Sequence, residues 1–151
     1  MSLISLQNYA EGHWITAKEE GEILHNAITG EPIFAASSAG LDFGAMMHYA
    51  RTKGSEKLRK MSFQERGLML KKLAFHLLER KEDFYRISAF TGATRSDSWV
   101  DIEGGIGNLF ANASLRRQFG NEWFYVEGDV AKLSRQNTFI GHHIMVPKEG
   151  V

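Results

Sequence analysis

Few side chains in this sequence stand at a spacing that could do chemistry. Asp101 and Glu103 are a carboxylate pair of the kind that acid–base catalysis uses. Residues two apart on a helix do not face each other, so we expect capping or solvation instead. His76 and Glu79 stand three apart on a predicted helix, which would suit a metal. Two ligands among leucines favour a histidine at the edge of the core, and we predict no metal site there.

The other reactive groups are equally sparse. His142 and His143 are adjacent on a predicted strand, where their side chains point to opposite faces and cannot bind one metal together. The sequence contains no cysteine, which excludes a disulfide, a thiolate metal ligand and a cysteine nucleophile within these residues. No serine stands in the G-x-S-x-G nucleophile motif. We therefore predict no catalytic residue, no cofactor-binding residue and no metal ligand in this chain.

Three glycines, Gly104, Gly105 and Gly107, form the most unusual cluster. A phosphate-binding loop follows a strand and opens a helix, whereas these glycines lie inside a predicted helix. Each glycine destabilises a helix interior by about 1 kcal/mol relative to alanine, so three together indicate a need for bare backbone. Close packing of another helix is the favoured interpretation, and a wall of a substrate passage is the alternative.

The predicted helix that carries these glycines lies between Thr91 and Gly120. Thr91 and Gly92 end the preceding helix, and Gly120 is a plausible stop for this one. Several short polar side chains could accept hydrogen bonds from the first free amides of the helix: Ser96, Asp97 and Ser98. One apolar face has the expected helical spacing: Ile102, Ile106, Leu109, Phe110 and Ala113.

Composition limits the class of protein. The chain has 151 residues, of which 43% are hydrophobic and 24% charged, with a formal net charge of +0. This length suits one domain, and the balanced charge argues against a nucleic-acid partner. No apolar run reaches the roughly 18 residues of a membrane span, and the N-terminus lacks the features of a signal peptide. We expect a cytoplasmic protein.

The order of the predicted elements indicates an α+β fold, with strands over residues 1–40, helices over 41–120 and strands over 121–147. Gly12 turns one early hairpin, and Gly30 turns another between Glu22 to Ala27 and Pro32 to Ser37. After residue 120, aromatic and β-branched residues predict three antiparallel strands: Trp123 to Val126, Val130 to Ser134 and Thr138 to Pro147. Pro147 to Gly150 is a predicted turn, and Val151 suggests that the chain is cut there.

Local signals define the helices of the middle region. Asp42 can cap the first of them, which Gly54 is expected to end. Ser62 and Glu65 form a capping box before the longest apolar stripe. That stripe contains Leu70, Leu73, Ala74, Leu77 and Leu78. Lys81 to Asp83 either continue this helix or interrupt it.

Taken in order, these motifs resemble the N-terminal portion of the aldehyde dehydrogenase superfamily. The resemblance rests on Gly-His-Trp-Ile, Ile28-Thr29-Gly30-Glu31-Pro32, Glu65-Arg66, Leu77-Leu78-Glu79-Arg80 and Thr91-Gly92. The stretches Thr91 to Ser98 and Val100 to Ile106 are similar to the aldehyde dehydrogenase part of the phenylacetate-degradation bifunctional proteins (PaaZ/PaaN type) and their benzoyl-CoA-pathway relatives. The match spans almost the whole chain but about the first third of such an enzyme.

The resemblance implies an enzyme that oxidises a CoA-linked semialdehyde through a cysteine thiohemiacetal and passes hydride to NAD or NADP. In the longer relatives, a hydratase domain that opens the oxepin-CoA ring follows. The cysteine, the glutamate base, the oxyanion-hole asparagine and the cofactor loop would lie beyond Val151, so this fragment would be an inactive scaffold.

The resemblance also implies that the helix carrying Gly104 lines the entrance of the substrate tunnel, and we expect Gly104, Gly105 and Asn108 to leave that entrance wide enough for a CoA-bearing aldehyde. The strands over 121–147 would then take part in contacts of a homo-oligomer. The alternative is a non-enzymatic α+β interaction module whose strands over 123–147 add to the sheet edge of a partner.

Overall fold

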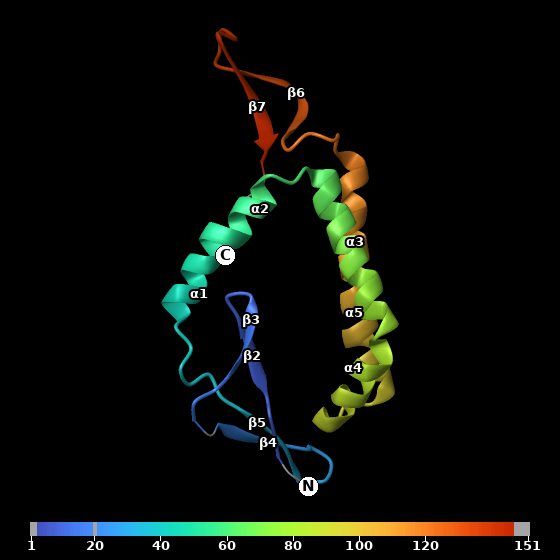
Figure 1. The fold of residues 1–151 in the computed structure, drawn as a ribbon. Coiled ribbons are helices and arrows are strands. Elements are labelled where there is room, and N and C mark those ends of the chain that lie inside the picture. The colour runs from blue at the N-terminus through green and yellow to red at the C-terminus, as the bar shows by residue number, and fades with distance from the viewer. Residues whose placement is uncertain (1–2, 20, 147–151) are drawn as a thin grey trace.

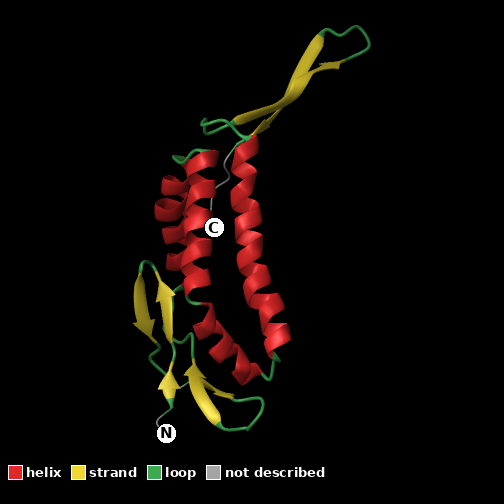
Figure 2. Cartoon of the chain, turned by 90° about the vertical axis from the view of Figure 1, so that its right-hand side faces the viewer, coloured by secondary structure: helices red, strands yellow, loops and turns green. Residues whose placement is uncertain are grey.

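The computed structural model describes residues 3–19 and 21–146 and confirms the α+β class. Small sheets lie at the N-terminal end, helices form the middle, and a long hairpin projects beyond them (Figures 1 and 2). The predicted turn Pro147 to Gly150, Val151 and the last residue of the predicted final strand fall outside the described residues.

The N-terminal region consists of two small sheets. Its strands are β1 (Ile4–Ser5), β2 (Gln7–Ala10), β3 (His13–Thr16), β4 (Glu22–His25) and β5 (Pro32–Ala36). Strands β2 and β3 form the predicted hairpin, whose turn has φ of 88° at Gly12. Strands β4 and β5 are antiparallel, with φ of 72° at Gly30 in their turn. Strand β1 pairs parallel to β5 and was not predicted, because two residues are too few to show a period.

The first helical segment is continuous where the sequence predicted an end. It consists of α1 (Phe43–Tyr49), a π-helical stretch (Ala50–Gly54) and α2 (Ser55–Arg59). The Oδ1 of Asp42 accepts a hydrogen bond from the amide of Ala45 at 2.9 Å, which confirms the predicted cap. The prediction that Gly54 ends the helix is wrong. Its φ of −69° is helical, so the glycine is accommodated without leaving the helix.

A second group of helices contains α3 (Phe63–Glu79), α4 (Lys81–Ser88) and α5 (Arg95–Ser114). Both bonds of the Ser62 and Glu65 capping box are present at the start of α3. Arg80, with φ of −105° and ψ of 10°, separates α3 from α4. The residues Lys81 to Asp83 therefore begin a new helix and do not continue the old one.

The boundaries of α5 differ from the prediction at both ends. Thr94 is the N-cap and forms a capping box with Asp97, so the expectation of a cap at Ser96 to Ser98 is wrong. The Thr-x-x-Asp spacing explains the difference, because it satisfies two amides reciprocally. The α-helix ends at Ser114 and a 3-10 turn continues to Gln118, so the helix ends before the expected stop at Gly120.

Helices α3 and α5 pack side by side, and α4 covers the N-terminal half of α5 (Figures 1 and 2). At Gly67 of α3, an added Cβ would lie 2.9 Å from the carbonyl oxygen of Ala113 in α5 and 2.7 Å from the Cβ of Arg116 in the 3-10 turn that follows α5. Ala74 and Ala113 are also buried, at 0% and 1% exposure. Leu73 belongs to the predicted apolar stripe but is 45% exposed.

Between residues 121 and 146 the structure has two strands where three were predicted. Strand β6 (Tyr125–Leu133) runs through the residues Glu127 to Asp129 that were expected to separate two strands, and it pairs antiparallel with β7 (Phe139–Met145). A register shift between Glu127 and Ala131 accommodates this segment, with φ of 66° at Gly128. A bulge therefore replaces the predicted turn.

The chain buries little of its apolar surface on itself. Its accessible surface is 11601 Å². A compact monomer of the same mass exposes about 7,700 Å² by the usual scaling of surface with mass. Among the described residues the buried hydrophobic side chains are Ala10, Ala74, Tyr85, Ile106 and Ala113. In the described ranges, no helix is long and apolar enough to cross a membrane.

The contact at Gly67 leads to a prediction about stability. Gly67→Ala places a methyl group against backbone and Cβ atoms that cannot move aside, so we expect a loss of about 1–3 kcal/mol in the free energy of unfolding. The matched variant Gly105→Ala has no atom within 4 Å of its new Cβ, so it should stabilise the protein by up to about 1 kcal/mol. Urea denaturation measures both, and equal effects would contradict the packing described.

Candidate functional site

The candidate site is the outward face of α5 around its glycines. Gly104, Gly105 and Asn108 are all exposed. A Cβ added at Gly104, Gly105 or Gly107 would meet no atom within 4 Å. The favoured prediction, that another element of the chain packs closely against these glycines, is therefore wrong within the described residues. Bare backbone is instead presented to the outside.

Close packing is found at a glycine that the sequence analysis did not single out. Gly67 lies on α3 and is buried against Arg116 and Ala113. A signal for it was present, because a lone glycine in the first half of a well-capped helix destabilises that helix unless another element requires it.

The glycines of α5 cannot form a phosphate-binding loop. They lie within the span Arg95–Ser114, so their amides belong to the hydrogen-bond ladder of the helix and are not free to bind an anion. Asn108 is engaged with its own helix, because the Nδ2 of Asn112 donates to both its carbonyl oxygen and its Oδ1 at 2.9 Å. These residues therefore do not fit the pyrophosphate of a nicotinamide dinucleotide.

The inward side of the same helix is apolar. Ile106 is 5% exposed. A shallow hollow of ≈ 260 Å³ lies beside it, between α3, α4 and α5. Its lining residues are Leu77, Phe84, Ile102, Gly105, Ile106 and Leu109. Gly105 borders this hollow although it is exposed, so the bare face almost opposite to Ile106 is formed by Gly104 and Asn108.

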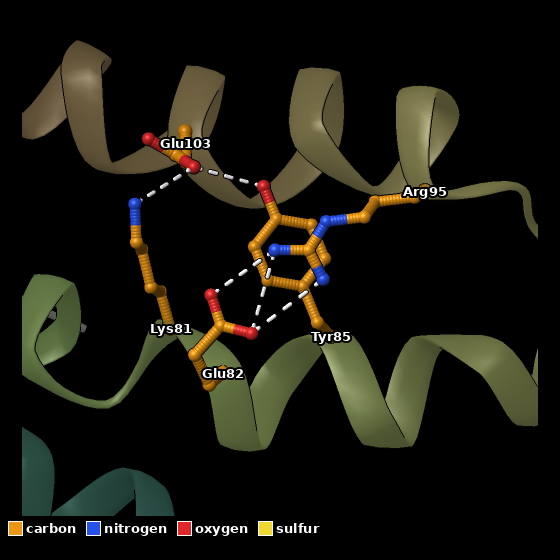
Figure 3. Close-up of polar contacts among 5 residues, drawn as sticks. All are labelled: Lys81, Glu82, Tyr85, Arg95 and Glu103. Atoms are coloured by element: carbon orange, nitrogen blue, oxygen red, sulfur yellow. Dashed lines mark hydrogen bonds and ion pairs between the residues drawn. The ribbon is translucent and has the colours of Figure 1, made fainter.

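A polar cluster joins α4 to α5 directly beside the glycines (Figure 3). The hydroxyl of Tyr85 donates a hydrogen bond to Oε1 of Glu103 at 2.8 Å, and Nζ of Lys81 donates to the same oxygen at 3.1 Å. Tyr85 is 7% exposed, and the Glu103 side chain is 26% exposed. This carboxylate is therefore engaged, which corrects the expectation that Glu103 is a solvated or capping residue.

The ring of Tyr85 is itself covered. The guanidinium carbon of Arg95 lies 4.2 Å from the ring centroid, a cation–π geometry. Arg95 is also paired with Glu82, whose Oε1 accepts from Nη2 at 3.1 Å. Sequence reasoning missed this cluster because Tyr85 and Glu103 stand 18 residues apart on two helices, and no local spacing links them.

The contacts shift the two titrating groups in opposite directions. The hydrogen bond from Tyr85 and the one from Lys81 lower the pKa of Glu103 below its ordinary value of 4.5. Burial, and then the hydrogen bond to Glu103, raise the pKa of Tyr85 above its ordinary value of 10.0. The pair is therefore held as a carboxylate that accepts from a neutral phenol.

The histidines do not take part in a group of three or more possible metal ligands in the part of the chain that the structure describes. His76 and Glu79 are both exposed on α3, so the expectation of a histidine at the edge of the core is wrong. Nδ1 of His143 lies 3.9 Å from Oε2 of Glu127, across the strand pair. Among the described residues, no three His, Cys, Asp or Glu side chains gather as metal ligands.

Comparison with known proteins gives one informative likeness. The chain is 31% identical over 149 residues to a protein of Aromatoleum evansii described as 3,4-dehydroadipyl-CoA semialdehyde dehydrogenase. The likeness covers 98% of this chain and 29% of that protein, so the chain spans less than a third of its relative. No protein-family model matches. The similarity supports the resemblance to aldehyde dehydrogenases that the motifs indicate.

The paired shifts predict how stability depends on pH. Folding lowers the pKa of Glu103. Its contribution to the free energy of unfolding is therefore present above pH 4.5 and is lost as the pH falls through the lowered pKa of the folded state. Folding raises the pKa of Tyr85. Its contribution to the free energy of unfolding is therefore present below pH 10.0 and is lost as the pH rises through the raised pKa of the folded state. The melting temperature of Tyr85→Phe should therefore fall below that of the wild type at neutral pH, and the two should converge at both extremes.

Tyr9→Phe is the matched control, because Tyr9 is 60% exposed on the hairpin of β2 and β3. Its melting temperature should follow that of the wild type throughout. A difference between wild type and Tyr85→Phe that stays constant from about pH 3 to about pH 11 would contradict the assigned contact.

Proposed function

We propose that this chain belongs to the aldehyde dehydrogenase superfamily and forms the N-terminal part of an NAD- or NADP-dependent enzyme that oxidises a CoA-linked semialdehyde. The observation that carries this proposal is the similarity to the semialdehyde dehydrogenase of Aromatoleum evansii across 98% of the chain. We place the complete enzyme in the cytoplasm, in the aerobic breakdown of an aromatic acid. Phenylacetate is the proposed acid, and a ring-opening hydratase domain is the proposed second activity.

In this proposal the chain is scaffold. Oxidation of an aldehyde through a covalent intermediate needs an activated nucleophile, and these 151 residues contain no cysteine. The glycines of α5 do not offer a dinucleotide site, for the reason given above. The large accessible surface of 11601 Å² supports a part that further chain covers. The reactive groups and the cofactor loop are accordingly assigned to the remainder of a longer protein.

The bare face of α5 is given the role of a substrate-passage wall. Gly104 carries no side chain, Asn108 is held along the helix by Asn112, and Gly105 leaves the neighbouring flank of the helix bare where it borders the apolar hollow. A helix face of this kind leaves the widest possible space beside a rigid backbone. A CoA-linked substrate needs such width, because its pantetheine and nucleotide occupy the entrance of the passage while the aldehyde group reacts further inside.

The hairpin of β6 and β7 is assigned to contacts between subunits of a homo-oligomer. Both of its faces carry exposed apolar side chains, with Phe139 at 69% and Ile140 at 68% exposure on opposite sides of one strand. Figure 2 shows the hairpin projecting well beyond the helices. In the rival proposal, a non-enzymatic module, the same strands add to the sheet of an unrelated partner.

The direct test uses the complete protein encoded by the reading frame that contains this chain. It is assayed with a CoA-linked semialdehyde, NAD and NADP, while nicotinamide reduction is followed by absorbance. Turnover that depends on a cysteine outside these 151 residues supports the proposal. A complete reading frame without such a cysteine, or turnover by the isolated 151 residues, would overturn it.

The passage assignment predicts a selective effect of Gly104→Leu. The leucine should raise KM for the CoA-linked aldehyde about tenfold or more while changing KM for a small aldehyde less than about twofold, since only the larger substrate needs the added space. Steady-state kinetics on the complete enzyme measure both. Gly120→Leu is the control, because Gly120 is also exposed with no atom within 4 Å of an added Cβ. Equal effects of Gly104→Leu on both substrates would remove the assignment.

The exposed strands predict that the isolated chain associates with itself. Unpaired strand edges and apolar faces favour such contacts at tens of micromolar, roughly the range in which exposed edges associate. Sedimentation velocity should show species larger than 17.0 kDa that diminish on dilution. Replacing Phe139 and Ile140 by serine should shift the distribution toward the monomer, and a wild-type chain that stays monomeric would count against this expectation.

A further inference from the structure

We propose that Tyr85 and Glu103 are a positioning pair that fixes the orientation and order of the glycine-bearing turn of α5. The proposal rests on the role assigned above to that turn and adds the contact that controls it. Neither residue is placed in contact with substrate. Both act through Gly104, the residue that directly follows Glu103 in the helix.

The turn needs an external anchor because its own sequence disfavours a helix. Glycine loses more backbone freedom in a helix than any other residue, and Gly104, Gly105 and Gly107 stand within four positions. Within the described residues, no atom approaches within 4 Å of the Cβ positions of these glycines. This stretch is therefore where α5 would unwind or rotate most easily.

Two anchors lie within and directly beside this turn. Ile106 is buried at 5% exposure and holds the inward face. Glu103 holds the side next to α4, where the Tyr85 hydroxyl and the Lys81 ammonium both donate to its Oε1, at 2.8 and 3.1 Å. Because successive residues of an α-helix are about 100° apart, fixing Glu103 toward α4 and Ile106 toward α3 turns Gly104 outward.

The donor side of the pair is held in place as well. Figure 3 shows the Tyr85 hydroxyl directed toward Glu103 and the Arg95 guanidinium lying against the Tyr85 ring. Arg95 covers the ring at 4.2 Å, and Oγ of Ser88 lies 2.8 Å from Oγ of Ser98, a residue only 2% exposed. Helix α4 is thus fixed to the start of α5 before the chain reaches Glu103. The tyrosine hydroxyl acts from a rigid support.

The experiment compares Tyr85→Phe with Glu82→Gln in the complete enzyme. Tyr85→Phe removes the hydroxyl and keeps the ring that Arg95 covers. Glu82→Gln alters the neighbouring exposed ion pair, in which the Glu82 side chain is 64% exposed, and leaves the contact with Glu103 intact. Two readouts are taken: hydrogen exchange of the amides over 104–108, and KM for the CoA-linked aldehyde relative to KM for a small aldehyde.

Tyr85→Phe should speed exchange over 104–108 at least fivefold relative to the amides of α3, and Glu82→Gln should not. It should also raise the KM ratio threefold or more with little change in kcat. Glu103→Gln, which keeps an acceptor for the hydroxyl but weakens the bond to Lys81, should give smaller effects in the same direction. Exchange that rises equally in α3 and α5 would indicate a merely structural role and would overturn the proposal.

The results separate this proposal from the function on which it rests. If Gly104→Leu affects both substrates equally but Tyr85→Phe still speeds exchange over 104–108, the passage assignment fails and the positioning pair stands. If Gly104→Leu is selective while Tyr85→Phe leaves both exchange and the KM ratio unchanged, the positioning pair fails. Exchange is measured without substrate, so it decides on the pair whatever the enzyme oxidises.

Discussion

The close approach of α3 and α5 at Gly67 is the constraint on which the rest of the structure depends. An added Cβ there would lie 2.9 Å from the carbonyl oxygen of Ala113 in α5 and 2.7 Å from the Cβ of Arg116 in the 3-10 turn that follows, so this approach requires that residue 67 has no side chain. The approach fixes which side of α5 is inward, where Ala113 is 1% exposed. The almost opposite side, with Gly104, is then necessarily outward. Gly67 allows the two helices to pack closely, and Gly104 leaves the outward side of α5 without a side chain.

Local sequence signals were sufficient for element types and for several ends. Asp42, the Ser62 and Glu65 capping box, and the glycine turns of the hairpins act over three or four residues, so they are legible in the sequence. The sequence did not indicate that two predicted strands form the single strand β6, because the same residue types around Gly128 are found in bulges and in turns. Which one forms depends on the partner strand, which is a tertiary property.

The candidate site was predictable in part for the same reason. The unusual glycines of α5 were visible in the sequence, but their surroundings were not. Whether a glycine packs against another element depends on residues far away in the chain. In this structure Gly67 packs closely, and the glycines of α5 do not. The contact of Tyr85 with Glu103 joins residues 18 apart on two helices, so neither spacing nor composition could have indicated it. Contacts between different helices and strands are the features that are hardest to predict from a single sequence.

A glycine-rich helix face also has a physical advantage over a loop as the wall of a passage. A loop of glycines would also lack side chains that project into the passage. Its backbone would fluctuate, however, and the width of the passage beside it would change with each fluctuation. A helix keeps its amides bonded to itself, so the bare surface stays at one position provided that something outside the glycines holds the helix. In this chain Ile106 and Glu103 supply that hold, one by burial and one by a shared carboxylate oxygen. If the face lines a passage as proposed, its width is set by contacts that the substrate never touches.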